Sequence, residues 1–511
     1  MKVFHVVAAT AAVMLATSTV SFSQVTVIRP EHEVSRPLRD IKPILPQAEG
    51  REEHAVKPVP SHSIGGTDTA LQSLPATTSA TVVGQTSFPG LGDGIAGFTM
   101  TGEPPDTNGS VGATQYVQWV NSMFAVFNKS TGATVYGPAN GNTLWSGSAI
   151  ANGRCASDNS GDPITLYDKV NNRWIMTQFA VSKSPYYQCV AVSKTSDATG
   201  AYNLYAYNFG TNFNDYPKVG VWPSGYFFTF NLFARGRTFA GGDMCAMDGA
   251  TARAGGAATM LCFNPGKSYG GLLPADVDGP TQPSGAEYVM NFGSNSLNVW
   301  RLTPNYSAGT MSVTGPTNLP VTAFSTACGG GTCIPQGTTT QQLDSLADRL
   351  MYRLAYRQFA GYGSLLVNHS VVAGSSTGVR WYELRDPGTG PAVSQQGTYA
   401  PDGNYRWMGS IAQDKLGNIA AGFSVSSSTQ YPAIAFASHA PSDAAGSLGG
   451  EITVDGGAGA QSGHSRWGDY ASISVDPTDD CTMWFTTERM NSSGDFKWGS
   501  TITHFKLGTC Q

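Results

Sequence analysis

Aspartates recur along the chain at matching positions, each near the polar start of a run in which apolar and polar side chains alternate. The set comprises Asp106, Asp162, Asp215, Asp344 and Asp469. Carboxyl groups that crowd together in a buried site can raise one another's pKa, so that one donates a proton while another stays ionised. Taken singly, each aspartate also fits a plain structural role, because Asp at a strand entrance commonly bonds the backbone of a turn. The set together predicts an acid–base site, provided that the fold brings its members to one place.

The runs around these aspartates are typical of β-hairpins, with a polar start, an alternating strand, a short turn and an aromatic-rich return strand. Hairpins are expected to begin at Asp106, Asp162, Asp215, Asp344, Arg406 and Arg466, with a weaker copy between Gly279 and Leu302. Repetition of one supersecondary unit predicts an all-β fold, a β-propeller of seven four-stranded blades. The first strand of each blade would line the central channel and carry the aspartates toward the axis. A pair of jelly-roll domains is the alternative.

The stretch SRWGDYASISVDP, residues 465–477, adds further candidates to this site. Arg-Trp occurs twice, which indicates a scaffold role such as a guanidinium stacked on an indole, whereas Gly-Asp-Tyr follows only the second copy. We therefore add Tyr470 to the aspartates as a catalytic candidate. An exposed Trp beside an Arg suits a sugar ring, although a core position for Trp467 fits equally well. The candidate substrate-binding residues are Arg406, Trp407, Arg466 and Trp467.

Composition excludes several classes of function. Only 13% of the 511 residues are charged, the chain holds 61 glycines and the formal net charge is -5. Without a basic run in the body of the chain, we expect no nucleic-acid partner. No stretch is apolar and long enough to span a membrane, so we expect none. We also expect a monomer.

The N-terminal part of the sequence indicates export. Residues 1–23 have the positive end, short apolar region and small-residue cleavage site of a signal peptide. Residues 24–100, first rich in Pro and charge and then in Ser, Thr and Gly, are expected to be a disordered, flexible pro-segment or linker before a propeller domain at 101–511. The protein should then be secreted or periplasmic.

All eight cysteines lie beyond the signal, and an oxidising compartment favours disulfides. They fall into near-neighbour couples without a C-x-x-C pair, and each couple would close a short loop, although sequence leaves the connectivity open. The couples are Cys155 and Cys189, Cys245 and Cys262, Cys328 and Cys333, and Cys481 and Cys510.

Three turn acids, Asp168, Asp414 and Asp476, give the chain a resemblance to a known family. Ser474, Asp476 and Trp484 resemble a stretched, degenerate Asp-box, the repeat S-x-D-x-G-x-T-W of sialidase-type propellers, without its central Gly. The chain also resembles secreted bacterial propellers whose last blade carries RWGDY. The sialidase resemblance implies an arginine cluster for a substrate carboxylate, a Tyr/Glu nucleophile pair and an acidic proton donor. Candidates for these parts are Arg349, Arg353, Arg406, Arg466, Tyr470 and Glu488.

Other catalytic signals fail. GHSRW lacks the second Gly of the nucleophile elbow, so a serine hydrolase is not expected. The histidines of the body have no metal-ligand spacing, and we expect no cofactor, with structural calcium as the one addition that loops such as DPTDD would allow. The sequence therefore predicts a secreted glycan-active protein, a sialidase-like glycoside hydrolase acting on an extracellular polysaccharide or glycoconjugate. A polysaccharide lyase, a non-catalytic glycan- or protein-binding propeller and a structural envelope protein are the alternatives.

Overall fold

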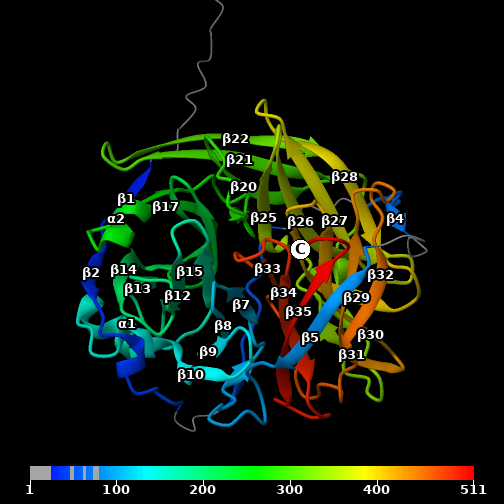
Figure 1. Ribbon diagram of the computed structural model, residues 1–511, viewed down its shortest axis with the longest axis horizontal. Coiled ribbons are helices and arrows are strands. Elements are labelled where there is room, and N and C mark those ends of the chain that lie inside the picture. Colours follow the sequence, from blue (N-terminus) through cyan, green and yellow to red (C-terminus); the bar gives the residue numbers. More distant parts are fainter. Residues whose placement is uncertain (1–24, 47–50, 61–64, 73–79) are drawn as a thin grey trace, which may run out of the picture.

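The computed structural model describes residues 25–46, 51–60, 65–72 and 80–511. The expected signal peptide at 1–23 lies outside the described residues. The fold is mostly β, with antiparallel sheets arranged around a common centre in a propeller-like ring (Figure 1). The short helices are α1 (Arg154–Ser157) and α2 (Gly249–Ala254), and the 3-10 turns are η1 (Leu38–Asp40), η2 (Gly141–Trp145), η3 (Ile150–Gly153) and η4 (Ala327–Gly330).

Three antiparallel sheets follow in chain order along the first half of the ring. The first holds β7 (Asn108–Val111), β8 (Gln115–Val120), β9 (Met123–Asn128) and β10 (Thr134–Asn140). The second holds β11 (Ile164–Asp168), β12 (Arg173–Ala180), β13 (Tyr186–Ser193) and β14 (Tyr202–Gly210). The third holds β15 (Asn212–Trp222), β16 (Gly225–Ala234), β17 (Thr238–Met247) and β18 (Met260–Phe263).

Two further sets of four strands join into one large sheet, because β19 and β25 pair in parallel. One set is β19 (Leu273–Asp278), β20 (Glu287–Gly293), β21 (Ser296–Asn305) and β22 (Thr310–Pro320). The other is β25 (Met351–Phe359), β26 (Tyr362–Ala373), β27 (Ser376–Asp386) and β28 (Ala392–Tyr399). A small sheet of β23 (Thr332–Ile334) and β24 (Leu343–Asp344) lies between them in sequence.

The last two sheets complete the ring. One is β29 (Tyr405–Gln413), β30 (Ile419–Ser427), β31 (Gln430–His439) and β32 (Gly449–Asp455). The other is β33 (Ser472–Val475), β34 (Met483–Met490), β35 (Trp498–Leu507) and β5 (Val82–Pro89), which comes from the N-terminal side of the chain. The first strands contact one another in the order β7, β11, β15, β19, β25, β29, β33 and back to β7, which closes the ring at its centre.

The hairpin predictions are confirmed at five of their positions and shifted at two. Hairpins begin near Asp106, Asp162, Asp215, Arg406 and Arg466. The weak copy after Gly279 is instead the second and third strand of its set, β20 and β21. The run from Asp344 holds the last residue of β24, a loop and the strand β25, because the chain turns back only after Phe359. The alternation of polar and apolar residues in that loop resembles the first strand of a hairpin, although the loop forms no such strand.

The turn acids have the structural role expected of them. Asp168, Asp414 and Asp476 each accept a hydrogen bond from a backbone amide two or three residues further along, at 2.9 Å. Trp484 Nε1 also donates to Asp476 at 3.2 Å, so the degenerate Asp-box couples a turn carboxylate to a buried indole.

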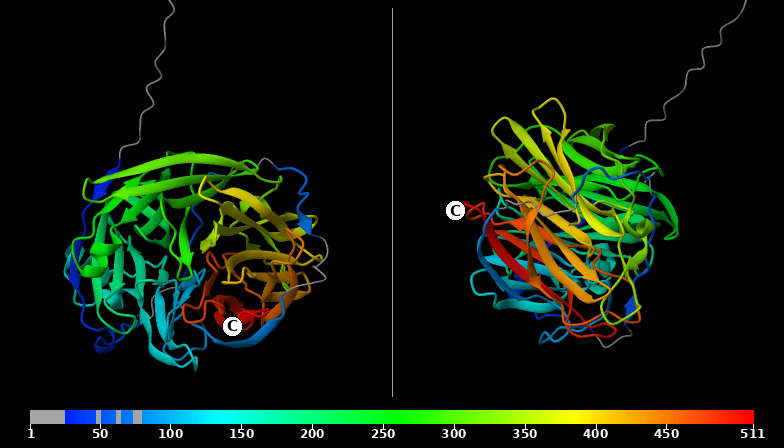
Figure 2. Two further views of the ribbon diagram at one scale, coloured as in Figure 1. Left: turned by 45° about the horizontal axis from the view of Figure 1, so that its top comes forward. Right: turned by 90° about the vertical axis from the view of Figure 1, so that its right-hand side faces the viewer.

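The expectation of a flexible linker over 24–100 is wrong for much of the part that is described. Its short strands β1 (Thr26–Ile28), β2 (Glu31–Val34) and β4 (Leu71–Gln72) pair with β18, β14 and β28 at the outer edges of three sheets, seen as blue segments on the outside in Figure 2. Backbone pairing at a sheet edge needs few apolar side chains, so a segment of low hydrophobicity can still be ordered. Composition alone could not reveal these pairings.

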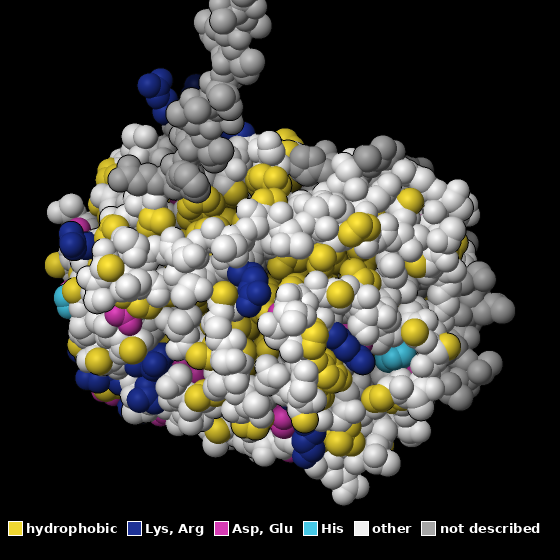
Figure 3. All heavy atoms as spheres, turned by 90° about the horizontal axis from the view of Figure 1, so that it is seen from above, with side chains coloured by type: hydrophobic (Ala, Val, Ile, Leu, Met, Phe, Trp, Pro, Cys, Tyr) yellow, Lys and Arg dark blue, Asp and Glu magenta, His cyan; other side chains and the backbone are white. Residues whose placement is uncertain are grey.

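Disulfides join each of the predicted near-neighbour couples: Cys155–Cys189, Cys245–Cys262, Cys328–Cys333 and Cys481–Cys510. Such bonds persist in an oxidising compartment. Among the described residues, no helix combines the length and the apolar character that crossing a membrane requires. On the face shown in Figure 3 most of the surface is uncharged, and the Lys and Arg side chains lie in small groups, some of them beside Asp or Glu.

Candidate functional site

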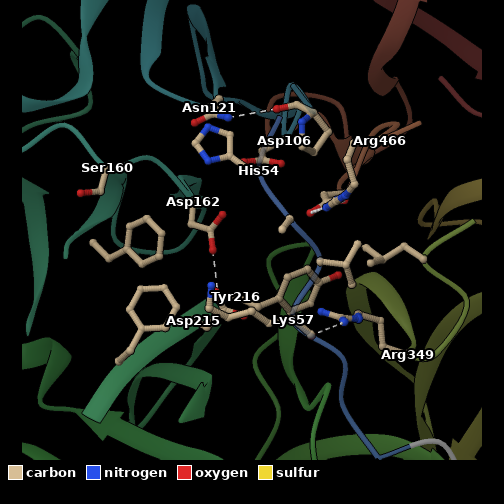
Figure 4. Close-up of a pocket in the computed structure, with 17 residues that line it drawn as sticks. His54, Lys57, Asp106, Asn121, Ser160, Asp162, Asp215, Tyr216, Arg349 and Arg466 are labelled. Atoms are coloured by element: carbon tan, nitrogen blue, oxygen red, sulfur yellow. Dashed lines mark hydrogen bonds and ion pairs between the residues drawn. The ribbon is translucent and has the colours of Figure 1, made fainter. Parts of the chain in front are cut away.

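A pocket near the centre of the ring brings together four of the five predicted aspartates. Asp106, Asp162, Asp215 and Asp469 line it, and Arg349 and Arg466 contribute positive charge to its wall. Figure 4 shows the labelled members of this set, Asp106, Asp162, Asp215, Arg349 and Arg466, around one cavity. The residues lie at or just before the first strands β7, β11, β15 and β33, where the chain enters the ring.

The backbone explains why aspartate suits these entrances. Asp106, Asp162 and Asp469 have φ values of 48°, 47° and 59°, in the left-handed region that Asp tolerates better than most residues. Tyr216, beside Asp215, has φ 54°. Strained φ values gather at functional sites more often than elsewhere. These three aspartates therefore combine a left-handed backbone conformation with a place in the pocket lining.

Burial and crowding raise the pKa of several of these carboxyl groups. The pKa of Asp215 rises to about 7, first because burial disfavours its charged form and then because Asp162 is close. Burial, with Asp162 and Asp469 nearby, also raises the pKa of Asp106 well above its usual value. Burial likewise raises the pKa of Asp162, whose Oδ2 accepts a hydrogen bond from Tyr216 N at 3.0 Å. Protonated carboxyl groups can thus exist in this pocket near neutral pH.

Asp469 differs from its neighbours because an arginine binds it directly. Arg466 Nη1 donates to Asp469 Oδ1 at 3.1 Å, and Arg466 Nη2 contacts the same carboxylate. The Arg466 side chain also faces Asp344 at 3.5 Å. Arg466 therefore stabilises a negative charge on the pocket wall. Burial raises the pKa of Asp344 to about 6, and this residue lies behind Arg466 rather than among the lining residues.

A buried lysine that sequence reasoning missed lies beside the pocket. Lys218 is 0% exposed, and its Nζ lies 3.3 Å from the ring centre of Tyr216 and 3.5 Å from that of Tyr470. Burial lowers its pKa well below the usual value, against the opposing effect of Asp162. Burial therefore favours its neutral form, so Lys218 contributes less positive charge to the pocket than an exposed lysine would. Alternation in the sequence could not single it out, because residues 216–222 are all buried in the structure.

The predicted aromatic part of the site lies in the core. Trp407 and Trp467 are both 0% exposed, their ring centroids are 5.9 Å apart, and Trp467 Nε1 donates to Ser424 Oγ at 3.1 Å. Neither indole can stack on a sugar ring, so of the two alternatives for Trp467 the core position is the one observed. Tyr470 is 1% exposed and is absent from the pocket lining, which removes its phenol from direct contact with a ligand in the pocket.

Some of the predicted arginines also lie outside the pocket. Arg406 is 1% exposed and binds Asp402 and Glu451, each at 2.8 Å, outside the pocket lining. Arg353 is buried against Asp276 and Asp278. Of the implied arginine cluster, only Arg466 and Arg349 reach the pocket, because repeated residues in different blades need not face the same cavity.

The N-terminal segment supplies part of the pocket lining. His54, Ala55, Val56 and Lys57 are among its lining residues, and Figure 4 shows His54 beside Asp106 and Asp162. The sequence had placed these residues in a linker. A polar segment of the chain thus lies against the carboxylates in this structure.

A second group of side chains could hold a metal ion. Glu103, His464 and Asp495 offer ligand atoms that all lie within 4.8 Å of one another. Nitrogen and carboxylate ligands of this kind suit zinc or manganese. His464 Nδ1 also pairs with Asp495 at 2.6 Å, which satisfies these two side chains without an ion.

Comparisons with known proteins find no matching family model and no matching curated protein. Among solved structures, the chain is similar to an endo-arabinase from Bacteroides thetaiotaomicron, with 12% identity, 67% of this chain and 92% of that chain covered, and a TM-score of 0.29. It is also similar to an ulvan lyase from a new polysaccharide lyase family, with 12% identity, coverage of 88% and 94%, and a TM-score of 0.33. A phage phi92 endosialidase gives 8% identity, coverage of 87% and 69%, and a TM-score of 0.35. These likenesses are too weak to assign an activity to the chain.

Proposed function

We propose that the protein is a secreted or periplasmic seven-bladed β-propeller that hydrolyses glycosidic bonds of an extracellular polysaccharide or glycoconjugate. The ring of first strands supports the blade count, since each of its members begins a set of four strands. Four disulfides in a chain with an export-type N-terminus support the location.

One observation carries the activity. A single pocket holds two kinds of acid. Burial raises the pKa of Asp215 and Asp106, whereas Arg466 binds the carboxylate of Asp469. Glycoside hydrolysis needs this pairing, because one carboxylic acid protonates the departing oxygen and a second, ionised group stabilises or attacks the sugar cation or activates water. Asp215 is the proposed proton donor, and Asp469 the proposed ionised partner.

The lyase alternative is less well supported by the same pocket. A lyase needs a base that takes a proton beside a substrate carboxylate. Tyr216 is the phenol that lines the pocket, yet burial raises its pKa, which disfavours the phenolate. A non-catalytic binding role would not need several buried acids in one cavity, since uncompensated burial of charge costs stability.

The test is an assay of the disulfide-formed protein on a panel of acidic and neutral polysaccharides. New reducing ends report hydrolysis, and absorbance of unsaturated uronates reports elimination. We expect hydrolysis that falls at least about 10³-fold in Asp469→Asn and in Asp215→Asn. The exposed Asp40→Asn is the control and should leave turnover unchanged. Elimination products, or full activity in both pocket variants, would contradict the proposal.

A further inference from the structure

Residues 51–60 cross the pocket as an extended strap. The strap starts with β3 (Glu52–Glu53), which pairs in parallel with β6 (Gly102–Glu103), and His54 N donates to Glu103 O at 2.7 Å. Further along, Arg349 Nη2 donates to Lys57 O at 3.3 Å, and Val59 N donates to Asp348 Oδ2 at 3.2 Å. Figure 4 shows the blue ribbon of this segment running between the carboxylates and Arg349. The strap is therefore fixed on both sides of the cavity that it crosses.

A carboxylate of the strap is bound by backbone amides of the loop that carries the site. Glu53 Oε1 accepts from Ser465 N at 2.9 Å and from Arg466 N at 3.0 Å. Two consecutive amides that converge on one oxygen form an anion-binding site. These amides belong to the same loop as Asp469, so an acid group bound there lies next to the pocket. Glu53 itself is exposed, which leaves this position open to competition from solution.

The strap also places basic side chains over the pocket. Lys57 and His54 each oppose the rise in pKa of a pocket carboxyl, Lys57 for Asp215 and His54 for Asp162. Lys57 Nζ lies 4.8 Å from the ring centre of Phe213 at the pocket wall. The strap thus contacts the site through complementary groups, as a ligand does. The Glu53 carboxylate accepts from the backbone amides, and Lys57 and His54 lie near the pocket carboxyl groups.

We propose that residues 51–60 are an intramolecular ligand that occupies the site, and that the Ser465 and Arg466 amides, filled here by Glu53, form a subsite for a carboxylate of an acidic polysaccharide. The inference rests on the proposed function for its ligand class. Polysaccharide and strap would compete for the same amides and the same cavity, so the strap must leave before a long chain can bind across the pocket.

Amide hydrogen exchange on the full mature chain tests the strap without reference to turnover. Glu53→Ala should raise exchange in residues 51–60 and at the Ser465 and Arg466 amides by about tenfold or more, because both lose their shared contact. Glu52→Ala is the matched control, since this neighbouring glutamate is exposed and has no side-chain hydrogen bond among those found in the described residues. Equal exchange in the wild type and in Glu53→Ala would overturn the proposal that Glu53 holds the strap on these amides.

Ligand competition tests the subsite. Oligogalacturonate is the probe, and neutral oligomers of matched length are the control. We expect the acidic probe to raise exchange in residues 51–60 while the Ser465 and Arg466 amides stay protected, and to bind Glu53→Ala at least fivefold more tightly than wild type. Protection of both the strap and the amides would overturn the proposal, because the strap would then be part of the binding wall. Preference for a polyglutamate peptide over the sugar acid would overturn the ligand class.

Turnover separates this inference from the proposed function. Faster hydrolysis by Glu53→Ala than by wild type, with Glu52→Ala unchanged, would support both. Release of the strap in the exchange experiment, together with no turnover of any polysaccharide by either protein, would overturn the hydrolase and leave the strap as an intramolecular ligand. Unfolding of Glu53→Ala is checked by its thermal transition, and Glu53→Gln, which keeps the shape and weakens the acceptor, should give an intermediate exchange rate.

Discussion

Arg466 binds the carboxylate of Asp469 three residues further along the chain, and the same guanidinium faces Asp344 behind the pocket wall. The Arg466 side chain is only 6% exposed. Removal of one partner would leave a buried charge uncompensated, which lowers the free energy of unfolding. The pair therefore links the stability of the ring to the chemistry of its pocket.

Removal of this arginine should be strongly destabilising. Arg466→Ala leaves two carboxylates without their cation, and we expect a loss of about 3 to 5 kcal/mol in the free energy of unfolding. Chemical denaturation measures it. The exposed pair Arg39 and Asp197 is the control, where Arg39→Ala should cost less than about 1 kcal/mol. In a double-mutant cycle, Arg466→Ala with Asp469→Ala should cost at least about 1 kcal/mol less than the sum of the single changes. Simple additivity would contradict the coupling.

Gly468 should tolerate no side chain. Its φ is 72°, and a Cβ there would lie 2.6 Å from Met408 Cγ. Gly84 has a similar φ of 65° but open space around the Cβ position, so Gly84→Ala measures the backbone cost alone. We expect about 1 kcal/mol for Gly84→Ala and about 1 to 3 kcal/mol more for Gly468→Ala, measured by denaturation. Equal losses would mean that Met408 moves away freely.

Asp243 in β17 should make stability fall as the pH rises. Burial raises its pKa to about 7 from 3.8, so the folded state keeps a proton that the unfolded state releases. Its contribution is fully present below about pH 4, where both states are protonated, and is lost as the pH rises to about 7. Asp243→Asn removes this loss, and its stability relative to wild type should grow over that range by on the order of 4 kcal/mol at most.

Denaturation of both proteins from pH 4 to pH 8 measures this effect. The exposed Asp40→Asn should follow the wild-type curve throughout. A stability difference between Asp243→Asn and wild type that stays constant with pH would show that Asp243 does not carry the titration.

The disulfides should contribute different amounts to the free energy of unfolding, according to the length of the loop that each one closes. Cys481 and Cys510 are separated by 29 residues, and Cys328 and Cys333 by 5. Loop entropy in the unfolded chain then predicts losses of about 3 to 4 kcal/mol for the first pair and about 2 kcal/mol for the second when both cysteines become alanine. Thermal and chemical denaturation of the two double variants would check the order. A reversed order would mean that native-state contacts, rather than loop entropy, set the values.

The sequence alone determined much of the local structure of this protein. Alternating runs and turn residues predicted an all-β chain and five hairpin starts, because side-chain alternation and turn chemistry act over a few residues. The spacing of the cysteines indicated near-neighbour couples, but the structure was needed to establish that each couple is bonded. The repeated position of Asp106, Asp162, Asp215 and Asp469 predicted their convergence, since equivalent positions in a closed ring face one axis.

Tertiary structure decided what local patterns could not. Arg406-Trp407 and Arg466-Trp467 read alike, yet only Arg466 reaches the pocket and both indoles are buried, because burial depends on which neighbouring sheet each side chain meets. The ordered strap depends on backbone pairing between Glu53 and Glu103 and on amides more than four hundred positions away, as Glu53 and Ser465 show with a separation of 412. Pairing of this kind uses main-chain groups that every residue carries, so composition leaves no trace of it.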